Sequence, residues 1–336
     1  MDRSIVEGAG VEFFGIPSGK LRRYFSLHNI SDVFKVLAGF FAARRILKRE
    51  APALLFSKGG FVSVPPCVAA NFLKIPVFTH ESDFSPGLAT KINSRFAQKI
   101  FLSYKESAAF FKGPVEAKLS VSGNPIRTDF AEADPAKGRK FLGLENDARI
   151  LLVLGGSLGS REINTLVSTC LPELTKYYTV VHQTGEGAAE ITDTAPRYKP
   201  FAYLRDELPH VIAAVELVLC RSGAGTIWEC KALGKPMVLI PFRGSGTRGD
   251  QVENARLFSD RGAALYFTPE AAVAADTAAS TVLSVAEKLS SLIAALAEDP
   301  ERRRIMGEAK VVDTDSHDGN NAAAFIAEEI VQKLKD

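Results

Sequence analysis

The chain has 336 residues, of which 46% are apolar and 24% charged, a composition typical of a folded protein with room for two domains. Its 41 basic and 39 acidic residues nearly balance, so the bulk charge gives no indication of nucleic-acid binding. The four cysteines form no CxxC pair, which argues against a zinc site and a disulfide framework. No apolar stretch is long enough to span a bilayer and no signal-peptide pattern opens the chain, so we expect a cytoplasmic protein.

The first distinctive segment, residues 18–50, combines basic and apolar side chains. Residues 31–50 place apolar residues at helical spacing among five basic ones, with Ser31 and Asp32 as candidate helix caps. A surface helix packed on a sheet explains most of these residues. The same pattern also suits a patch that rests on an anionic membrane surface, which is the second interpretation from the pattern alone.

Short apolar runs then alternate with helix-length segments. The runs lie at residues 53–59, 76–82, 99–104, 148–156, 178–185, 216–223 and 236–242. Runs of this kind, buried on both faces, predict parallel strands of an α/β fold. Several end in Gly, Ser, His or Thr, and ligands bind at the carboxyl ends of strands in such sheets. Between residues 131 and 147 the pattern lapses into a polar segment with a proline, which we interpret as a domain linker.

Two turns in the second half of the chain have the composition of phosphate-binding turns. Residues 155–160, GGSLGS, would bring backbone N–H groups and the Ser157 hydroxyl to a helix N-terminus, where an anion is favoured. This is neither a P-loop nor a complete dinucleotide fingerprint, and a plain tight turn explains it equally well. Residues 220–229, CRSGAGTIWE, repeat the arrangement, and Glu229 could accept hydrogen bonds from a ribose diol or only cap its helix. Two such turns in one domain strengthen the nucleotide interpretation.

A third loop, residues 241–255, is polar and rich in glycine. The helix that follows carries Gln251 and Asn254, and amide side chains commonly hold hydroxyl-rich ligands. Arg243 and Arg248 could meet a diphosphate or be solvated.

A group-transfer reaction needs a general base. His80 precedes Glu81 and Asp83 at a strand end, which makes it the strongest candidate among the five histidines. His182 also ends a strand, but we expect it to make a structural hydrogen bond. No Ser-His-Asp grouping and no acidic metal-binding pair is recognisable, so we predict neither a metal ion nor a cofactor.

Arg127 lies beside the predicted domain boundary, where a side chain can face a cleft between domains.

These segments together resemble the MurG family, the N-acetylglucosaminyltransferases of peptidoglycan synthesis in glycosyltransferase family 28. The resemblance covers residues 10–265 and rests on SKGGFVSVPPCVAA, THESDFSPGLATK, GNPIRTD, LVLGGSLGSREIN, HQTG, CRSGAGTIWE and RGDQVENA, in the family's order and approximate spacing. It implies a GT-B fold, in which two Rossmann-like domains with parallel sheets face each other across a cleft. We therefore expect an acceptor domain at residues 1–130, a linker at 131–147, a UDP-sugar domain at 148–315, and a C-terminal helix at 316–336 that packs back on the first domain.

The resemblance also implies a reaction. It is an inverting, metal-independent transfer of N-acetylglucosamine from UDP-N-acetylglucosamine to lipid I, the undecaprenyl-diphosphate-linked muramoyl-pentapeptide. The product is lipid II, formed at the cytoplasmic face of the cell membrane. The protein would then be peripheral, with residues 18–48 facing the anionic membrane surface, and would have no nucleic-acid partner.

Matching positions carry over the family's donor-binding roles. Ser157 and the amides around it would contact the diphosphate, Glu229 the ribose hydroxyls and Gln251 the sugar. Arg205 falls where a backbone amide reads the uracil, and Asp83 stands where the family usually has Asn. The predicted donor-binding residues are Asp83, Arg127, Ser157, Arg205, Ala224, Gly225, Thr226, Glu229, Gln251 and Asn254.

The beginning of the chain departs from the family pattern. Family members open with a strand, a GGTGGH-type loop and a helix, and that loop carries the histidine assigned as base. Met1 corresponds to a point past the second strand, so we expect an incomplete first domain that lacks about one βαβ unit and is poorly stable. The chain would then bind the uridine nucleotide but turn over poorly, with His80 and Glu81 as candidate substitute bases. The alternatives are a non-catalytic UDP-sugar-binding subunit that needs a partner, and a UDP-sugar epimerase on the same scaffold.

Overall fold

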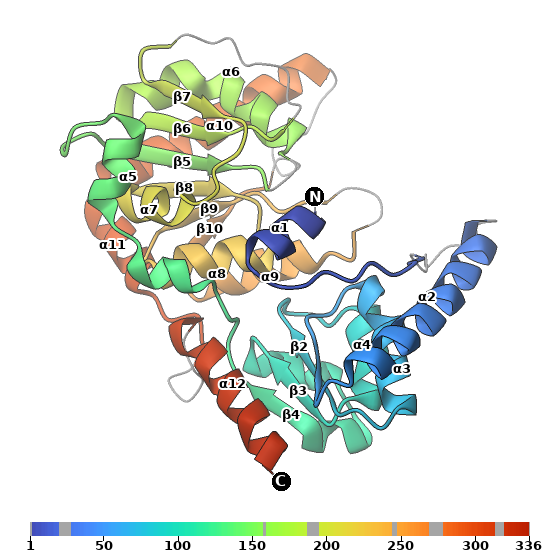
Figure 1. The fold of residues 1–336 in the computed structure, drawn as a ribbon. Helices are drawn as coiled ribbons and strands as arrows, with labels where there is room; N and C mark the ends of the chain where they lie inside the picture. Colours follow the sequence, from blue (N-terminus) through green and yellow to red (C-terminus); the bar gives the residue numbers. More distant parts are fainter. Residues whose placement is uncertain are drawn as a thin grey trace. The chain divides into compact units, whose positions relative to one another are not determined.

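A computed structural model describes residues 2–19, 28–156, 159–186, 195–243, 247–268, 278–312 and 319–335. The chain divides into two compact units (Figure 1). The first unit comprises Met1–Ser122 and Ala324–Asp336, and the second unit comprises Gly123–Ala323. Each unit has its own parallel sheet with helices around it, which confirms the predicted α/β class.

The first unit is built on a four-stranded sheet of order β1-β2-β3-β4. Its strands are β1 (Leu55–Ser57), β2 (Val77–Glu81), β3 (Lys99–Leu102) and β4 (Leu119–Val121), and neighbouring strands pair in parallel. Its α-helices are α1 (Asp2–Gly8), α2 (His28–Glu50), α3 (Val64–Phe72) and α4 (Leu88–Phe96). Three 3₁₀ helices, Phe61–Ser63, Lys105–Phe110 and Gly113–Lys118, lie in the connections between these elements.

The last helix of the chain, α12 (Gly319–Lys335), contributes to the first unit from the far end of the sequence. Ile326 packs with the buried Phe78 and Phe101, and the ring centroids of Phe101 and Phe325 are 6.2 Å apart. The apolar contact therefore joins the C-terminal segment to β2 and β3.

The second unit is built on a six-stranded sheet of order β10-β9-β8-β5-β6-β7. Its strands are β5 (Ile150–Leu154), β6 (Thr179–Gln183), β7 (Tyr198–Phe201), β8 (Leu217–Cys220), β9 (Met237–Leu239) and β10 (Ala264–Tyr266). Its helices are α5 (Pro135–Leu142), α6 (Arg161–Tyr177), α7 (Leu208–Ala214), α8 (Ala224–Ala232), α9 (Asp250–Asp260), α10 (Ala278–Glu298) and α11 (Pro300–Glu308), with a 3₁₀ helix at Thr128–Glu132. β5 pairs with β6 on one side and β8 on the other, so the strand order reverses there. Such a switch point is where open α/β sheets bind ligands.

Helix α6 shows how local sequence produces the local structure at this point. The side chain of Ser160 accepts a hydrogen bond from the Ile163 N–H, 3.3 Å away, and so caps the helix. Its buried apolar residues recur at helical spacing: Ile163, Leu166, Val167, Cys170, Leu171 and Leu174. Each fully buried aliphatic side chain contributes roughly 2 kcal/mol. The apolar face thus fixes the helix against the core, while its N-terminus stays at the edge of the sheet.

The segment predicted as a linker, residues 131–147, instead contains α5 and belongs to the second unit. The Asp134 N–H donates to Nδ1 of His210, 3.0 Å away, and a Cβ at Gly138 would come within 2.1 Å of the His210 carbonyl oxygen. The polar residues of this segment did not indicate that it packs closely against α7. The division between the units accordingly falls between residues 122 and 123.

Candidate nucleotide-binding site

The turn after β5 depends on glycine. Gly159 has a φ of +73°, and a Cβ there would lie 2.2 Å from the carbonyl oxygen of Thr184. A Cβ at Gly155 would lie 2.6 Å from the Ser160 nitrogen. No other residue fits these two positions without a backbone shift. Ser157, predicted to contact the diphosphate, lies outside the described residues.

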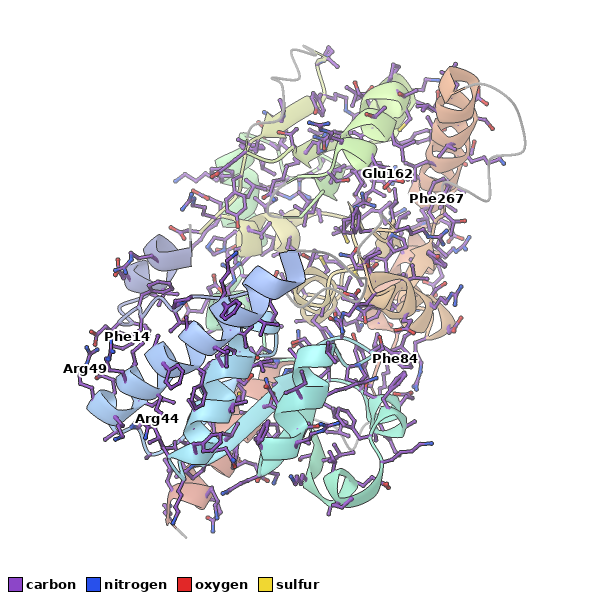
Figure 2. All side chains as sticks on the ribbon, turned by 90° about the vertical axis from the view of Figure 1, so that its right-hand side faces the viewer. Phe14, Arg44, Arg49, Phe84, Glu162 and Phe267 are labelled. Carbon is purple, nitrogen blue, oxygen red and sulfur yellow. The ribbon has the colours of Figure 1, made fainter. Side chains whose placement is uncertain are left out.

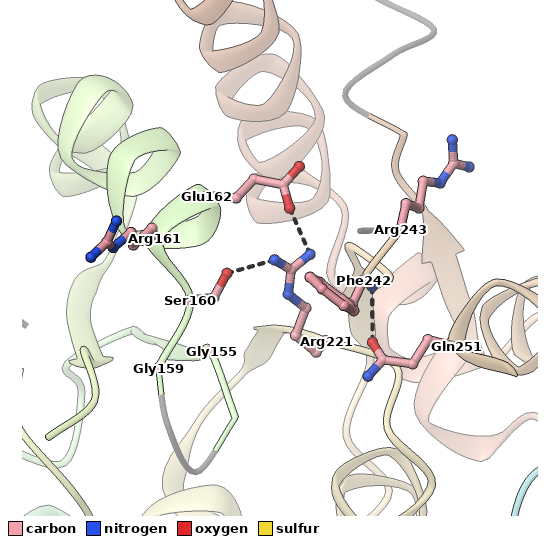
Figure 3. A pocket seen from close by; sticks show the side chains of 9 residues that line it. All are labelled: Gly155, Gly159, Ser160, Arg161, Glu162, Arg221, Phe242, Arg243 and Gln251. Carbon is pink, nitrogen blue, oxygen red and sulfur yellow. Dashed lines mark hydrogen bonds and ion pairs between the residues drawn. The ribbon is translucent and has the colours of Figure 1, made fainter. Parts of the chain in front are cut away.

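A pocket of about 580 Å³ opens beside this turn (Figure 3). Its lining residues are Gly155, Gly159, Ser160, Arg161, Glu162, Arg221, Phe242, Arg243 and Gln251. Three arginines against one glutamate make the lining cationic, although Arg161 points away from the Arg221 guanidinium (Figure 3). The N-terminus of α6 adds its own partial positive charge. The pocket therefore favours an anionic group such as a diphosphate.

Arg127 and Glu229, which are 102 positions apart in the sequence (229 − 127), meet in the second unit. Arg127 Nε lies 3.4 Å from Glu229 Oε1, and the Glu229 side chain is 17% exposed. Burial raises the pKa of the Glu229 carboxyl, and the Arg127 charge opposes that rise. Arg127 also lies 3.5 Å from Asp129 Oδ2. Glu229 thus pairs with an arginine at this site.

Polar side chains fix the start of α8 to α9. The Ser222 hydroxyl donates to the backbone oxygen of Gln251, 2.7 Å away, and Asn254 Nδ2 donates to the Ser222 carbonyl, 3.1 Å away. Gln251 Oε1 accepts from the Phe242 N–H at 2.9 Å. Asn254 is fully buried, and its side chain contacts Ser222, two residues before the predicted positions Ala224, Gly225 and Thr226. Asn254 does not line the pocket, and its assignment to the donor stays a prediction.

His182 is buried inside the second unit. Its Nδ1 lies 3.0 Å from the Tyr198 hydroxyl and its Nε2 lies 3.1 Å from Asn164 Oδ1. Burial lowers the pKa of His182 to about 4, so the ring is neutral at pH 7. These contacts have the character expected of a structural histidine.

Arg205 lies outside the pocket lining. Its side chain is 66% exposed, pairs with Glu186 Oε1 at 3.5 Å and lies over the ring of Tyr203. The assignment of this position to the uracil stays a prediction.

The candidate bases lie in the first unit, at the end of β2. His80 is fully buried, and its Nδ1 lies 3.0 Å from Nζ of Lys58. Both carboxylate oxygens of Glu81 are engaged, because they accept hydrogen bonds from the N–H groups of Asp83 and Gly87, each at 3.1 Å. Desolvation lowers the pKa of the Lys58 ammonium to about 8. Glu81 therefore holds the turn that carries Asp83.

Metal-binding clusters and membrane-spanning helices are both missing from the part of the chain that the structure describes. No group of three or more His, Cys, Asp or Glu side chains there could hold a metal ion. No described helix is both long and apolar enough to cross a bilayer.

Comparison with known proteins identifies the family. The profile of the glycosyltransferase family 28 N-terminal domain matches residues 1–102, and that of the C-terminal domain matches residues 150–311. Over 284 residues the chain is 47% identical to a UDP-N-acetylglucosamine–N-acetylmuramyl-(pentapeptide) pyrophosphoryl-undecaprenol N-acetylglucosamine transferase of Treponema denticola. That match covers 79% of this chain and 73% of the relative. The chain belongs to glycosyltransferase family 28.

Solved structures share the fold of this family 28 chain. MurG of Acinetobacter baumannii matches with a TM-score of 0.70 at 21% identity, covering 99% of this chain and 88% of that one. UDP-GlcNAc 2-epimerase of Neisseria meningitidis, solved with UDP-GlcNAc bound, matches with a TM-score of 0.62 at 15% identity, covering 93% and 83%. The predicted GT-B class of two Rossmann-like units is confirmed, and family membership makes the chain a hexosyltransferase.

Four residues that line this pocket were not predicted from the sequence: Arg161, Glu162, Arg221 and Phe242. Arg221 carried a usable signal, because a charged residue directly after a buried strand must be satisfied at the ligand-binding edge of the sheet. Arg161, Glu162 and Phe242 carried none, since exposed charged residues in a first helical turn are common and loop aromatics have many roles.

Proposed function

We propose that this chain transfers N-acetylglucosamine from UDP-N-acetylglucosamine to lipid I and so forms lipid II. The name of its 47% identical relative describes a transfer of N-acetylglucosamine to an undecaprenyl-diphosphate-linked muramoyl-pentapeptide. The observation that carries the proposal is the cationic pocket at the N-terminus of α6, and the Arg127 and Glu229 pair of the same unit supports it. A nucleotide sugar combines a diphosphate with two sets of hydroxyl groups, and this site offers partners for each.

The proposed roles follow the donor from one end to the other. The turn with Ser157 and the start of α6 would hold the diphosphate. Glu229 would accept hydrogen bonds from the ribose hydroxyls, and the adjacent Arg127 would favour its ionised form. Gln251 would contact the transferred sugar, since its side chain lines the pocket.

The proposed reaction is a single displacement at the anomeric carbon. The acceptor hydroxyl forms the new C–O bond from the face opposite the nucleotide, and the bond to the diphosphate breaks, so the configuration inverts. UDP leaves with the bonding electron pair, and the arginines with the helix N-terminus would stabilise its charge without a metal ion. The acceptor hydroxyl gives up its proton as the new bond forms, and we propose water as the first proton acceptor, because His80 and Glu81 are both buried and engaged.

We also propose that the enzyme rests on the cytoplasmic face of the membrane. Helix α2 exposes Phe34, Leu37 and Phe41 on one face, and Phe34 is 67% exposed. Arg44 and Arg49 lie toward the end of the same helix, where the Arg49 guanidinium covers the ring of Phe14 (Figure 2). An apolar helix face beside basic residues suits an anionic bilayer, and lipid I is anchored in one.

Calorimetric titration with UDP-N-acetylglucosamine tests the donor assignment. Saturable binding of one molecule per chain is expected, and absence of binding would overturn the proposal. Incubation with the nucleotide sugar alone tests the epimerase alternative, because only an epimerase would accumulate the C2 epimer. Binding without any transfer to lipid I would favour the non-catalytic subunit.

A further inference from the structure

Arg221 follows β8 directly and lines the pocket, with 11% of its side chain exposed. We propose that Arg221 is the positioning residue of the donor site. Its guanidinium joins the start of α6 to the loop after β9, and through that loop it holds the Gln251 amide where the donor sugar binds. This inference rests on the proposed function.

The first side of this bridge is the start of α6. Arg221 Nη2 donates to Ser160 Oγ at 2.6 Å, and Nη1 pairs with Glu162 Oε2 at 2.7 Å (Figure 3). Ser160 caps the helix and Glu162 lies in its first turn. Hydrogen bonds that involve a charged partner are about twice as strong as neutral ones, so these two contacts hold the Arg221 guanidinium strongly at the start of α6.

The second side is the loop after β9. Arg221 Nη1 also donates to the carbonyl oxygens of Ile240 at 3.1 Å and Pro241 at 3.3 Å, and the guanidinium lies over the Phe242 ring. The N–H of Phe242 in turn donates to Oε1 of Gln251 (Figure 3). A continuous set of contacts therefore leads from α6 through Arg221 to the amide proposed to bind the sugar.

The two sides depend on Arg221 to different degrees. The turn before α6 has other anchors, because Gly159 packs on the Thr184 backbone and Asn164 Nδ2 donates to the Thr184 carbonyl at 2.9 Å. The carbonyls of Ile240 and Pro241 instead converge on the single guanidinium. Loss of Arg221 should therefore disturb the sugar contact more than the diphosphate contact.

The geometry requires arginine rather than any cation. A guanidinium carries five N–H donors in a planar fork, so it can serve acceptors on both sides at once. A lysine ammonium has the same charge but only three N–H donors, so it cannot serve all four acceptors, which lie on Ser160, Glu162, Ile240 and Pro241. Arg221→Lys therefore weakens the bridge and leaves the charge of the pocket unchanged.

Calorimetric titration of the full chain with UDP and with UDP-N-acetylglucosamine tests the proposal. Arg221→Lys should weaken binding of the nucleotide sugar about tenfold and binding of UDP by less than about threefold. The matched control is Arg304→Lys on the surface of α11, which pairs with Glu301 and Glu308 and should leave both affinities unchanged. Equal losses for both ligands would overturn the positioning role and indicate direct contact with the diphosphate.

A double-variant measurement tests the route through Gln251. If Arg221 acts by positioning this amide, Arg221→Lys adds no further loss of UDP-N-acetylglucosamine affinity to Gln251→Ala. Losses that multiply would contradict the route. Should Arg221→Lys fail to fold, Glu162→Gln decides the question, because it removes the half-exposed carboxylate that holds the guanidinium on α6. A loss confined to the nucleotide sugar supports the proposal, and an equal loss for both ligands or no loss overturns it. Failure of the unaltered chain to bind either ligand would instead refute the proposed function.

Discussion

Arg127 Nε and Glu229 Oε1 lie 3.4 Å apart, and the carboxyl of this pair is the more buried partner, with 17% of the Glu229 side chain exposed against 48% of the Arg127 side chain. The arginine thus compensates a carboxylate that has lost part of its hydration. A carboxylate held in this way can accept hydrogen bonds from two neighbouring hydroxyl groups.

Glu229→Ala removes the proposed ribose acceptor. UDP affinity should fall about tenfold, since a hydrogen bond to a charged group contributes roughly 1.5 kcal/mol or more. Calorimetry with UDP measures the loss. Glu301→Ala, an exposed glutamate of α11, is the matched control and should bind UDP normally. An unchanged affinity in Glu229→Ala would show that the ribose lies elsewhere.

The pH dependence of UDP binding should report the same carboxyl. Burial raises the pKa of Glu229, so the acid limb of the binding profile should lie at a higher pH than an ordinary glutamate would give. Arg127→Ala removes the charge that opposes the rise, so it should move this limb to still higher pH. Affinity titrations over a pH series measure the shift, and coincident limbs would mean that the two groups do not interact.

His182 should make the second unit sensitive to acid. Its folded pKa of about 4 lies below the ordinary histidine value of 6.5, so between these pH values the unfolded chain binds a proton that the folded unit excludes. The contribution of His182 to the free energy of unfolding should be constant above pH 6.5. It should fall by about 3 kcal/mol between pH 6.5 and pH 4 and should not change further below pH 4. Urea unfolding can be followed by Trp228, the single tryptophan of the chain, which is buried in this unit.

The carboxyl groups also titrate in this range, so the comparison with His182→Gln isolates the histidine. The variant should lose less stability between pH 6.5 and pH 4 than the unaltered chain. Parallel losses in both proteins would contradict a buried neutral His182.

Gly159→Ala should destabilise the second unit by about 3 kcal/mol, because the new Cβ combines a left-handed backbone with a clash against the Thr184 carbonyl. The control is Gly225→Ala in α8, where no atom lies within 4 Å of the position that the new methyl group would take. That change should be neutral or stabilising, since alanine favours a helix over glycine. Similar midpoints in Trp228-detected unfolding would contradict the proposed dependence of the turn on glycine.

The apolar face of α2 should govern membrane binding. Phe34→Ser combined with Phe41→Ser should reduce partitioning to anionic vesicles about tenfold or more, because each buried phenylalanine contributes roughly 2 kcal/mol. Vesicle sedimentation measures the bound fraction. Ile305→Ser, at an exposed apolar residue of α11, is the control and should bind as the unaltered chain does. Equal binding by the double variant would place the membrane contact elsewhere.

The sequence predicted the strands best where every residue of the strand is buried. β5 and β8 are apolar throughout and both were expected, as was their parallel arrangement. β4, β7 and β10 were not expected, because they are three or four residues long and only partly buried. Short edge strands of this kind take their form from neighbours that no local pattern encodes.

The site divides in the same way. Glu229 and Gln251 were predicted because they follow recognisable turns, and the structure brings Arg127 to one and Phe242 to the other. The role of Arg221 depends on where its guanidinium reaches, and its partners at Ser160 and Ile240 are distant in the sequence. Contacts between residues so far apart in the sequence depend on the fold, and a local motif cannot predict them.

The transfer of labelled N-acetylglucosamine from its UDP conjugate to lipid I tests the central claim most directly. The chain should form labelled lipid II, a metal chelator should not reduce the rate, and Glu229→Ala should reduce it at donor concentrations that half-saturate the unaltered chain. A protein that binds UDP-N-acetylglucosamine but leaves lipid I unlabelled, or that returns the sugar as its C2 epimer, would contradict the proposed transfer.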